Sequence, residues 1–201
     1  MSMHIDGKKV TAMYWGGRKI REAWHEGQRV FSGKPVEVMP PTPGWYDAWD
    51  WLRAKVTEYG ESYETVTELP FEIDSSQATK MSSMFEGFSA LTTVPAMDTS
   101  QATDMSYMFR GCSSLTTVPD MDTSQVTNMG SMFGWCSSLT AIPDMNTHNV
   151  TDTSYMFYVC SALTDGNVRL IGKHPSVETA FMIDQSGLTR EPFYNINGQP
   201  I

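Results

Sequence analysis

The chain has 201 residues, a mass of 22.5 kDa and a net charge of −9 at neutral pH. This length suits one domain with a small appendage and excludes two large catalytic domains. The acidic surplus lies beyond residue 43, while residues 1–43 carry only a small basic surplus. Because no basic stripe is available to displace the counterions of phosphates, we expect no nucleic acid among its partners.

The chain also lacks the usual signals of export and of catalysis. Its first residues, MSMHIDGKKV, are charged where a signal peptide needs an apolar run, and no stretch reaches the roughly 18 apolar residues of a membrane span. No HExxH, G-x-S-x-G or glycine-rich phosphate motif occurs, and the four histidines are scattered. We therefore expect a chain without a membrane span that is not an enzyme and takes no cofactor or metal.

Residues 1–33 predict a small antiparallel β-meander that serves as an anchoring module. Short segments rich in β-forming residues alternate with turns such as Gly16-Gly17. A sheet of this size has little core of its own, so its apolar side chains need a partner surface, in other copies of the chain or in a larger assembly. The candidate assembly anchor consists of Val10, Met13, Trp15, Ile20, Trp24, Val30 and Phe31.

Residues 34–43 contain several prolines and predict a semi-extended linker. After it, Trp45, Trp49, Leu52 and Val56 recur at helical spacing, which predicts an amphipathic helix over residues 44–60 that caps the next region.

A 24-residue period dominates the rest of the chain. Met-Phe recurs at residues 84–85, 108–109, 132–133 and 156–157, with cysteine, leucine and threonine at fixed offsets. A unit this short cannot bury its own apolar side chains, so neighbouring units must cover them. Over residues 44–201 the pattern predicts an α/β repeat solenoid of 24-residue units in about five coils, closed by a degenerate C-terminal cap over residues 165–201.

Within one unit, the spacing of Met129, Met132, Phe133 and Cys136 predicts a short helix capped by the Thr127 hydroxyl. Residues 139–142 predict a short strand, which would stack in parallel with those of other units. Cys112, Cys136 and Cys160 occupy one repeated position and are interpreted as small buried hydrophobic residues rather than disulfide partners.

Repeated acids begin successive units at Asp74, Asp98 and Asp122, with Asn146 in the fourth. Stacked carboxylates repel unless a cation such as calcium neutralises them. We favour the alternative, in which each accepts backbone N–H bonds from the turn that follows.

Positions where the repeats differ are candidates for ligand contact. Tyr107, Trp135, Tyr155 and Tyr158 are interpreted as an aromatic patch suited to sugar faces or to a protein hot spot, and the favoured alternative is that they only seal the surface. Thr93 and Thr117 are expected at outward strand positions and are further ligand-binding candidates.

The repeat unit DTSQVTNMGSMFGWCSSLTAIPDM resembles the BspA-like bacterial leucine-rich repeats, of the DTSxVTxMxxMFxxCxxL type. That resemblance implies a leucine-rich-repeat-like fold and a non-enzymatic binding role. The segment VTAMYWGGRKIREAWHEGQRVF resembles short modules of minor tail proteins from phages of Gram-positive bacteria.

Together these resemblances imply a structural protein of a bacteriophage virion, a minor tail or head decoration protein. It would be assembled in the host cytoplasm, anchored to other virion proteins as a homo-oligomer, and exposed on the particle to contact a host-surface glycan or protein. The alternative is a bacterial cell-surface adhesin or interaction repeat protein.

Overall fold

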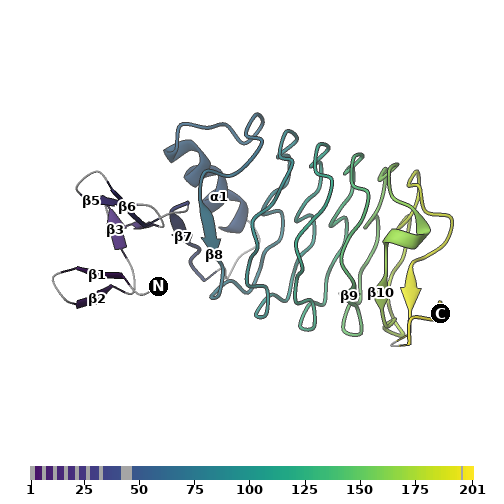
Figure 1. Cartoon of the computed structure of the whole chain (residues 1–201). Helices are drawn as coiled ribbons and strands as arrows, with labels where there is room; N and C mark the ends of the chain where they lie inside the picture. Colours follow the sequence, from purple (N-terminus) through teal and green to yellow (C-terminus); the bar gives the residue numbers. More distant parts are fainter. Residues whose placement is uncertain are drawn as a thin grey trace.

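The computed structural model describes the backbone of short strands within residues 3–31, then residues 34–41, 47–195 and 197–201. Side chains are described for residues 34–41, 48–195 and 197–201. Figure 1 shows the repeat units side by side along the chain from strand β8 to strand β10.

The N-terminal strands pair as separate hairpins. β1 (Met3–Ile5) pairs with β2 (Lys8–Val10), and β5 (Ala23–His25) with β6 (Gln28–Phe31), each as an antiparallel two-stranded sheet. A four-stranded sheet has the order β3-β4-β7-β8, from β3 (Met13–Trp15), β4 (Arg18–Ile20), β7 (Val36–Val38) and β8 (Glu72–Asp74). The predicted single β-meander is therefore wrong, because the edge of the β3–β4 hairpin pairs with β7 and not with a neighbouring hairpin.

β7 lies within the segment expected to be a linker and pairs in parallel with β8, which begins the repeats. The helix α1 (Asp47–Glu58) ends two residues before the expected end at residue 60, and residues 44–46, with Trp45, lie outside the described residues. Leu52 and Val56 of α1 are buried in the core. The predicted N-terminal capping helix is wrong, because the element that satisfies the edge of β8 is the strand β7.

The apolar side chains of the repeats form the core, as expected. Both members of all four Met-Phe pairs are fully buried. The phenylalanine rings stack on one another: Phe85 and Phe109 have centroids 5.4 Å apart, Phe109 and Phe133 5.5 Å, and Phe133 and Phe157 5.7 Å, with nearly parallel planes. Each ring is thus covered in part by the equivalent rings of neighbouring units.

The predicted helix of the repeat is absent: in the described part of the chain α1 is the only α-helix. In each repeat turn every second amide donates to a carbonyl oxygen of the next unit, as Ser83 does to Ser106 (2.9 Å). The amides between them donate to the carbonyl oxygen three residues earlier, as Phe88 does to Phe85 (3.1 Å). An α-helix needs every amide to donate four residues back. The Thr127 hydroxyl also bonds to the Thr103 carbonyl of the preceding unit (3.1 Å) and caps nothing.

The predicted strand over residues 139–142 is also absent. Strands near the C-terminus are shorter and lie elsewhere: β9 (Met145–Asn146), β10 (Leu170–Ile171) and β11 (Phe193–Tyr194) form a parallel sheet of order β11-β10-β9. A 3₁₀ turn at Asp165–Asn167 precedes β10. The described strands of the repeats therefore belong to two small sheets near the two ends, and a separate series of isolated parallel bridges links successive units from Lys80 to Glu178.

The predicted fold class, an α/β repeat solenoid of about five coils with an N-terminal cap helix and a meander, is thus overturned. The predicted helices and strands require a regular pattern of backbone hydrogen bonds, and the amides of the repeats donate to other carbonyl oxygens. In the described chain the repeats consist of turns and extended segments with bonds to equivalent positions of neighbouring units.

Candidate binding surface

Two residues of each repeat turn adopt left-handed backbone angles, four positions apart. The first is Ser83, Tyr107, Ser131, Tyr155 or Phe181, and the second is Gly87, Gly111, Trp135, Val159 or Gln185. Glycine adopts such angles without steric cost, whereas other residues lose roughly 1 kcal/mol or more. Trp135, with φ of 63°, therefore stands where two earlier units use glycine.

These turn positions hold four of the six large hydrophobic side chains that are exposed in the described part of the chain. Tyr107 is 40 % exposed, Trp135 39 %, Tyr155 38 % and Phe181 60 %. With the half-buried Tyr158 they form what we call the aromatic surface: Tyr107, Trp135, Tyr155, Tyr158 and Phe181.

The rings at the C-terminal end of the aromatic surface contact one another. Tyr158 packs edge-on against Trp135, with centroids 5.0 Å apart, and against Tyr155, at 5.7 Å. Tyr155 stacks on Phe181 at 5.0 Å. The Gln185 amide donates to the Tyr158 hydroxyl (3.0 Å). The structure therefore brings Trp135, Tyr155 and Tyr158 together.

Tyr107 is linked to these rings through Arg110. The guanidinium carbon lies 5.7 Å from the centroid of Tyr107 and 4.6 Å from that of Trp135. Arg110 also donates a hydrogen bond to Glu86 Oε1 (2.6 Å), and Glu86 holds the equivalent position in the preceding unit. Cations over ring faces are attracted by the ring quadrupole, so Arg110 helps to orient the rings of Tyr107 and Trp135. Its ion pair with Glu86 balances the charge of the guanidinium.

Phe181, in the aromatic surface, and Arg110, which contacts two of its rings, were not among the candidates predicted from the sequence. In the last repeat the Met-Phe pair is reversed, as Phe181-Met182. That reversal indicates a degenerate copy of the repeat and does not predict an exposed ring. The 24-residue period does not locate it, because the residue 24 positions after Tyr155 is Thr179; the backbone angles show that Phe181 shares the first left-handed position with Tyr155.

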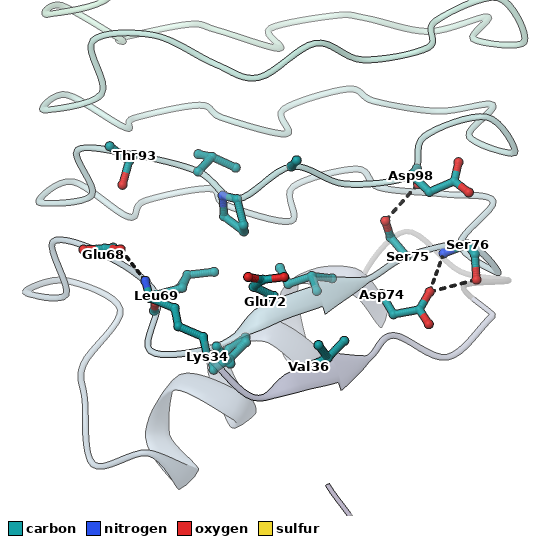
Figure 2. A pocket seen from close by; sticks show the side chains of 15 residues that line it. Lys34, Val36, Glu68, Leu69, Glu72, Asp74, Ser75, Ser76, Thr93 and Asp98 are labelled. Carbon is teal, nitrogen blue, oxygen red and sulfur yellow. Dashed lines mark hydrogen bonds and ion pairs between the residues drawn. The ribbon is translucent and has the colours of Figure 1, made fainter. Parts of the chain in front are cut away.

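The threonine candidates lie apart from the aromatic surface. Thr93 and Thr117 are both exposed. Thr93 lines an open groove of about 890 Å³, which Figure 2 shows between β8 and the extended segment of the next unit. Lys34, at one end of the groove, pairs with Glu68 and donates to the Leu69 carbonyl (2.6 Å).

The acids of the repeats accept hydrogen bonds from the turns that follow them, as we favoured. The amide of Ser76 donates to Asp74 (3.2 Å), that of Ser100 to Asp98 (3.0 Å) and that of Ser124 to Asp122 (2.9 Å). The hydroxyl and amide of Ser100 lower the pKa of Asp98, and the amide and hydroxyl of Ser124 lower the pKa of Asp122. The described residues contain no group of three or more metal-binding side chains.

The three cysteines are free and buried, as expected. Their thiols donate to phenylalanine carbonyl oxygens of the preceding unit: Cys112 to Phe85 (3.1 Å), Cys136 to Phe109 (3.0 Å) and Cys160 to Phe133 (2.9 Å). Burial raises the pKa of Cys112 and of Cys160 to about 12. They are packing groups rather than nucleophiles.

The candidate anchor lies in strands whose backbone is described, but its side chains fall outside the described residues: Val10, Met13, Trp15, Ile20, Trp24, Val30 and Phe31. In the described part of the chain, no helix has the length and apolar character needed to cross a bilayer.

Comparisons with known proteins reach the repeats alone. Searches of curated proteins and of solved structures found no match. Residues 79–170 match a family model described as "Mycoplasma protein of unknown function, DUF285". That family is related to the BspA-like repeat proteins, so this stretch of the chain is similar to a repeat-containing domain and is compatible with a BspA-like repeat protein.

Proposed function

We propose that this chain is a non-enzymatic binding protein of a bacteriophage particle, a minor tail or head decoration protein. Residues 1–33 join it to other virion proteins or to further copies of itself, and the repeats present the aromatic surface to a glycan or protein of the host surface. The particle is assembled in the host cytoplasm, and the repeats are exposed on it.

The observation that carries the binding role is the exposure of aromatic rings at strained turn positions. At the second left-handed position, which Trp135 holds, folding alone favours glycine, as at Gly87 and Gly111, because glycine adopts left-handed angles freely. Large exposed apolar patches mark interaction sites, and tryptophan and tyrosine dominate binding hot spots. The ring of Trp135 is therefore retained against a backbone cost, which a binding role explains.

Trp135→Gly is expected to abolish binding while leaving stability within about 1 kcal/mol, because relief of the left-handed backbone offsets the lost contacts with Tyr158 and Arg110. Binding is measured with the labelled full-length chain on a panel of intact Gram-positive bacteria, and stability by urea unfolding. We expect saturable binding by the unaltered chain to at least one strain and at least a tenfold weaker signal for Trp135→Gly.

Val159→Gly is the matched control, because Val159 holds the same turn position in the next unit, with φ of 60°. It relieves the same strain without removing an aromatic ring and is expected to bind as the unaltered chain does. Equal binding by Trp135→Gly and the unaltered chain, or no binding to any strain, would refute the proposed role.

The placement on a virion is supported by the resemblance of residues 1–33 to modules of phage minor tail proteins. Two described sheets in this region, β1–β2 and β5–β6, have two strands each. A two-stranded hairpin is at best marginally stable alone in water, so a module built this way gains stability by packing against a partner.

Self-association of the full-length chain is expected through this module. Light scattering after size exclusion should give a mass above the 22.5 kDa of one chain. Replacing Trp15 and Trp24 together by Ser is expected to yield a monomer, whereas Trp135→Ser, which removes a tryptophan from the repeats, should leave the mass unchanged. A monomeric unaltered chain argues against the homo-oligomeric anchor.

The alternative is a bacterial cell-surface adhesin or interaction repeat protein, and the match of residues 79–170 to a family related to BspA-like proteins supports it. An antibody against the repeats separates the two. Labelling of purified phage particles supports the virion, and labelling confined to the bacterial surface supports the adhesin.

A further inference from the structure

A second hollow lies beside the aromatic surface, at its N-terminal end. It has a volume of about 490 Å³ and is lined by α1, the loop after it and the first two repeat turns, through Trp49, Tyr63, Ser83, Glu86, Tyr107 and Arg110. This volume is within the range of roughly 300–1,000 Å³ typical of small-molecule sites. We propose that this hollow, the turn pocket, binds one pyranose ring of a neutral glycan. The inference rests on the proposed function and adds a ligand class to it.

The aromatic walls of the turn pocket are held in place by neighbouring groups. The guanidinium carbon of Arg53 lies 4.1 Å from the centroid of Trp49 and 3.5 Å from that of Tyr63, so one cation contacts both rings. The Trp49 indole N–H donates to the Glu86 carbonyl (3.2 Å), which fixes its ring against the first repeat. Rings held before binding lose little conformational freedom when a ligand arrives.

Gly87 keeps the space between these walls open. Its φ is 79°, and a Cβ built on it would lie 3.7 Å from Cε2 of Tyr63. A side chain at this position would occupy the pocket against the Tyr63 ring. In the third unit the equivalent residue is Trp135, which carries a side chain where the first two units have glycine. The turn pocket is therefore a feature of the first two units rather than of every repeat.

The two charged side chains that line the pocket, Glu86 and Arg110, form an ion pair. Glu86 accepts from Nη1 of Arg110 at 2.6 Å, with 29 % and 38 % of the two side chains exposed. In the described part of the chain Arg110 Nε is buried without a hydrogen-bond partner. A buried donor without an acceptor costs about 1–3 kcal/mol, so a ligand oxygen that accepts a hydrogen bond from this N–H is favoured.

These features match a sugar ring better than an ion or a purely apolar ligand. The faces of aromatic rings are electronegative and attract the partly positive C–H groups of a pyranose, while its hydroxyls can donate to the Glu86 carboxylate and accept from Arg110. Because the Glu86–Arg110 pair is neutral as a unit, it offers no net charge to a charged ligand. The adjoining aromatic surface then extends the contact along a glycan chain.

The test starts with the labelled full-length chain on an array of bacterial cell-wall and capsular glycans. The strongest neutral oligosaccharide is then titrated by calorimetry and by saturation-transfer NMR. We expect saturable binding, with transfer to the ring C–H protons of one terminal or internal sugar. Tyr107→Gly, which removes a pocket ring at φ of 60°, is expected to raise the Kd about tenfold or more.

Ser131→Gly is the matched control. Ser131 has the same turn position, with φ of 55°, but it neither lines the turn pocket nor belongs to the aromatic surface. It should change the Kd by less than about threefold. Equal losses in the two variants overturn the pocket as the site, and a blank glycan array, or binding only to charged peptides, overturns the sugar as the ligand.

The outcomes separate this inference from the proposed function. If Trp135→Gly loses binding to cells while the glycan array is blank, the binding role stands and the sugar pocket is wrong. If neither cells nor glycans are bound, both are wrong.

Discussion

Phe133→Ala is expected to lower the free energy of unfolding by about 3–5 kcal/mol, the usual cost of deleting a fully buried phenylalanine. The Phe133 ring is completely buried and stacked between those of Phe109 and Phe157, at 5.5 and 5.7 Å. Its removal leaves a cavity that two neighbouring units line, and these units cannot collapse into it without breaking the backbone bonds between them. Urea unfolding followed by circular dichroism measures the change.

Phe181→Ala is the matched control, since Phe181 has the same side chain and is 60 % exposed. We expect a loss below about 1 kcal/mol for it, because little of its surface is removed from water. A loss at Phe133 no larger than that at Phe181 would show that the stacked rings are not the core of the repeats.

The native thiols are expected to react with Ellman's reagent about a thousandfold or more slowly at pH 8 than those of the urea-unfolded chain. Only the thiolate reacts, and burial raises the pKa of Cys112 and Cys160 to about 12 from an unperturbed 9.0, which lowers the thiolate fraction about a thousandfold. Burial also holds the pKa of Cys136 well above its usual value. Reagent access is hindered further because all three side chains are buried.

Ser137→Cys provides the control, because Ser137 is exposed beside Cys136 and a thiol there should react at a normal rate. Fast reaction of all thiols in the unaltered folded chain would contradict the buried assignment. The same raised pKa values predict the pH dependence of stability. The folded state prefers the neutral thiols, so their contribution is intact below about pH 9 and is lost as the pH rises towards 12.

The binding surface was only partly predictable from residues. Tyr107, Trp135, Tyr155 and Tyr158 attract notice because they vary where the repeat is otherwise constant. The turn pocket, by contrast, joins Trp49 and Tyr63 to Arg110, residues from different elements. No local pattern relates α1 to the second repeat, since their proximity is a result of tertiary packing.

The helix expected at Met129–Cys136 failed for a reason that local spacing cannot reveal. Residues at i, i+3, i+4 and i+7 lie on one side of a helix. The same spacing also places side chains on one side of the turns seen here, in which left-handed residues recur four positions apart. The choice between the two depends on where the amides donate. Here every second amide donates to the next unit, as from Phe133 to Met156 (3.0 Å).

The amino-acid sequence by itself determined the 24-residue period, the burial of the Met-Phe pairs and of the cysteines, and the acid-capped turns. These features follow from residue types that recur at fixed offsets. Apolar side chains are buried away from water whatever hydrogen bonds the backbone makes. An aspartate before Thr-Ser accepts a hydrogen bond from the turn that follows it. Tertiary structure alone decided the absence of helices in the repeats, the pairing of β7 with β8 and the separate hairpins. Each of these is a choice of hydrogen-bond partner made between distant segments, and such choices are settled only when the segments meet.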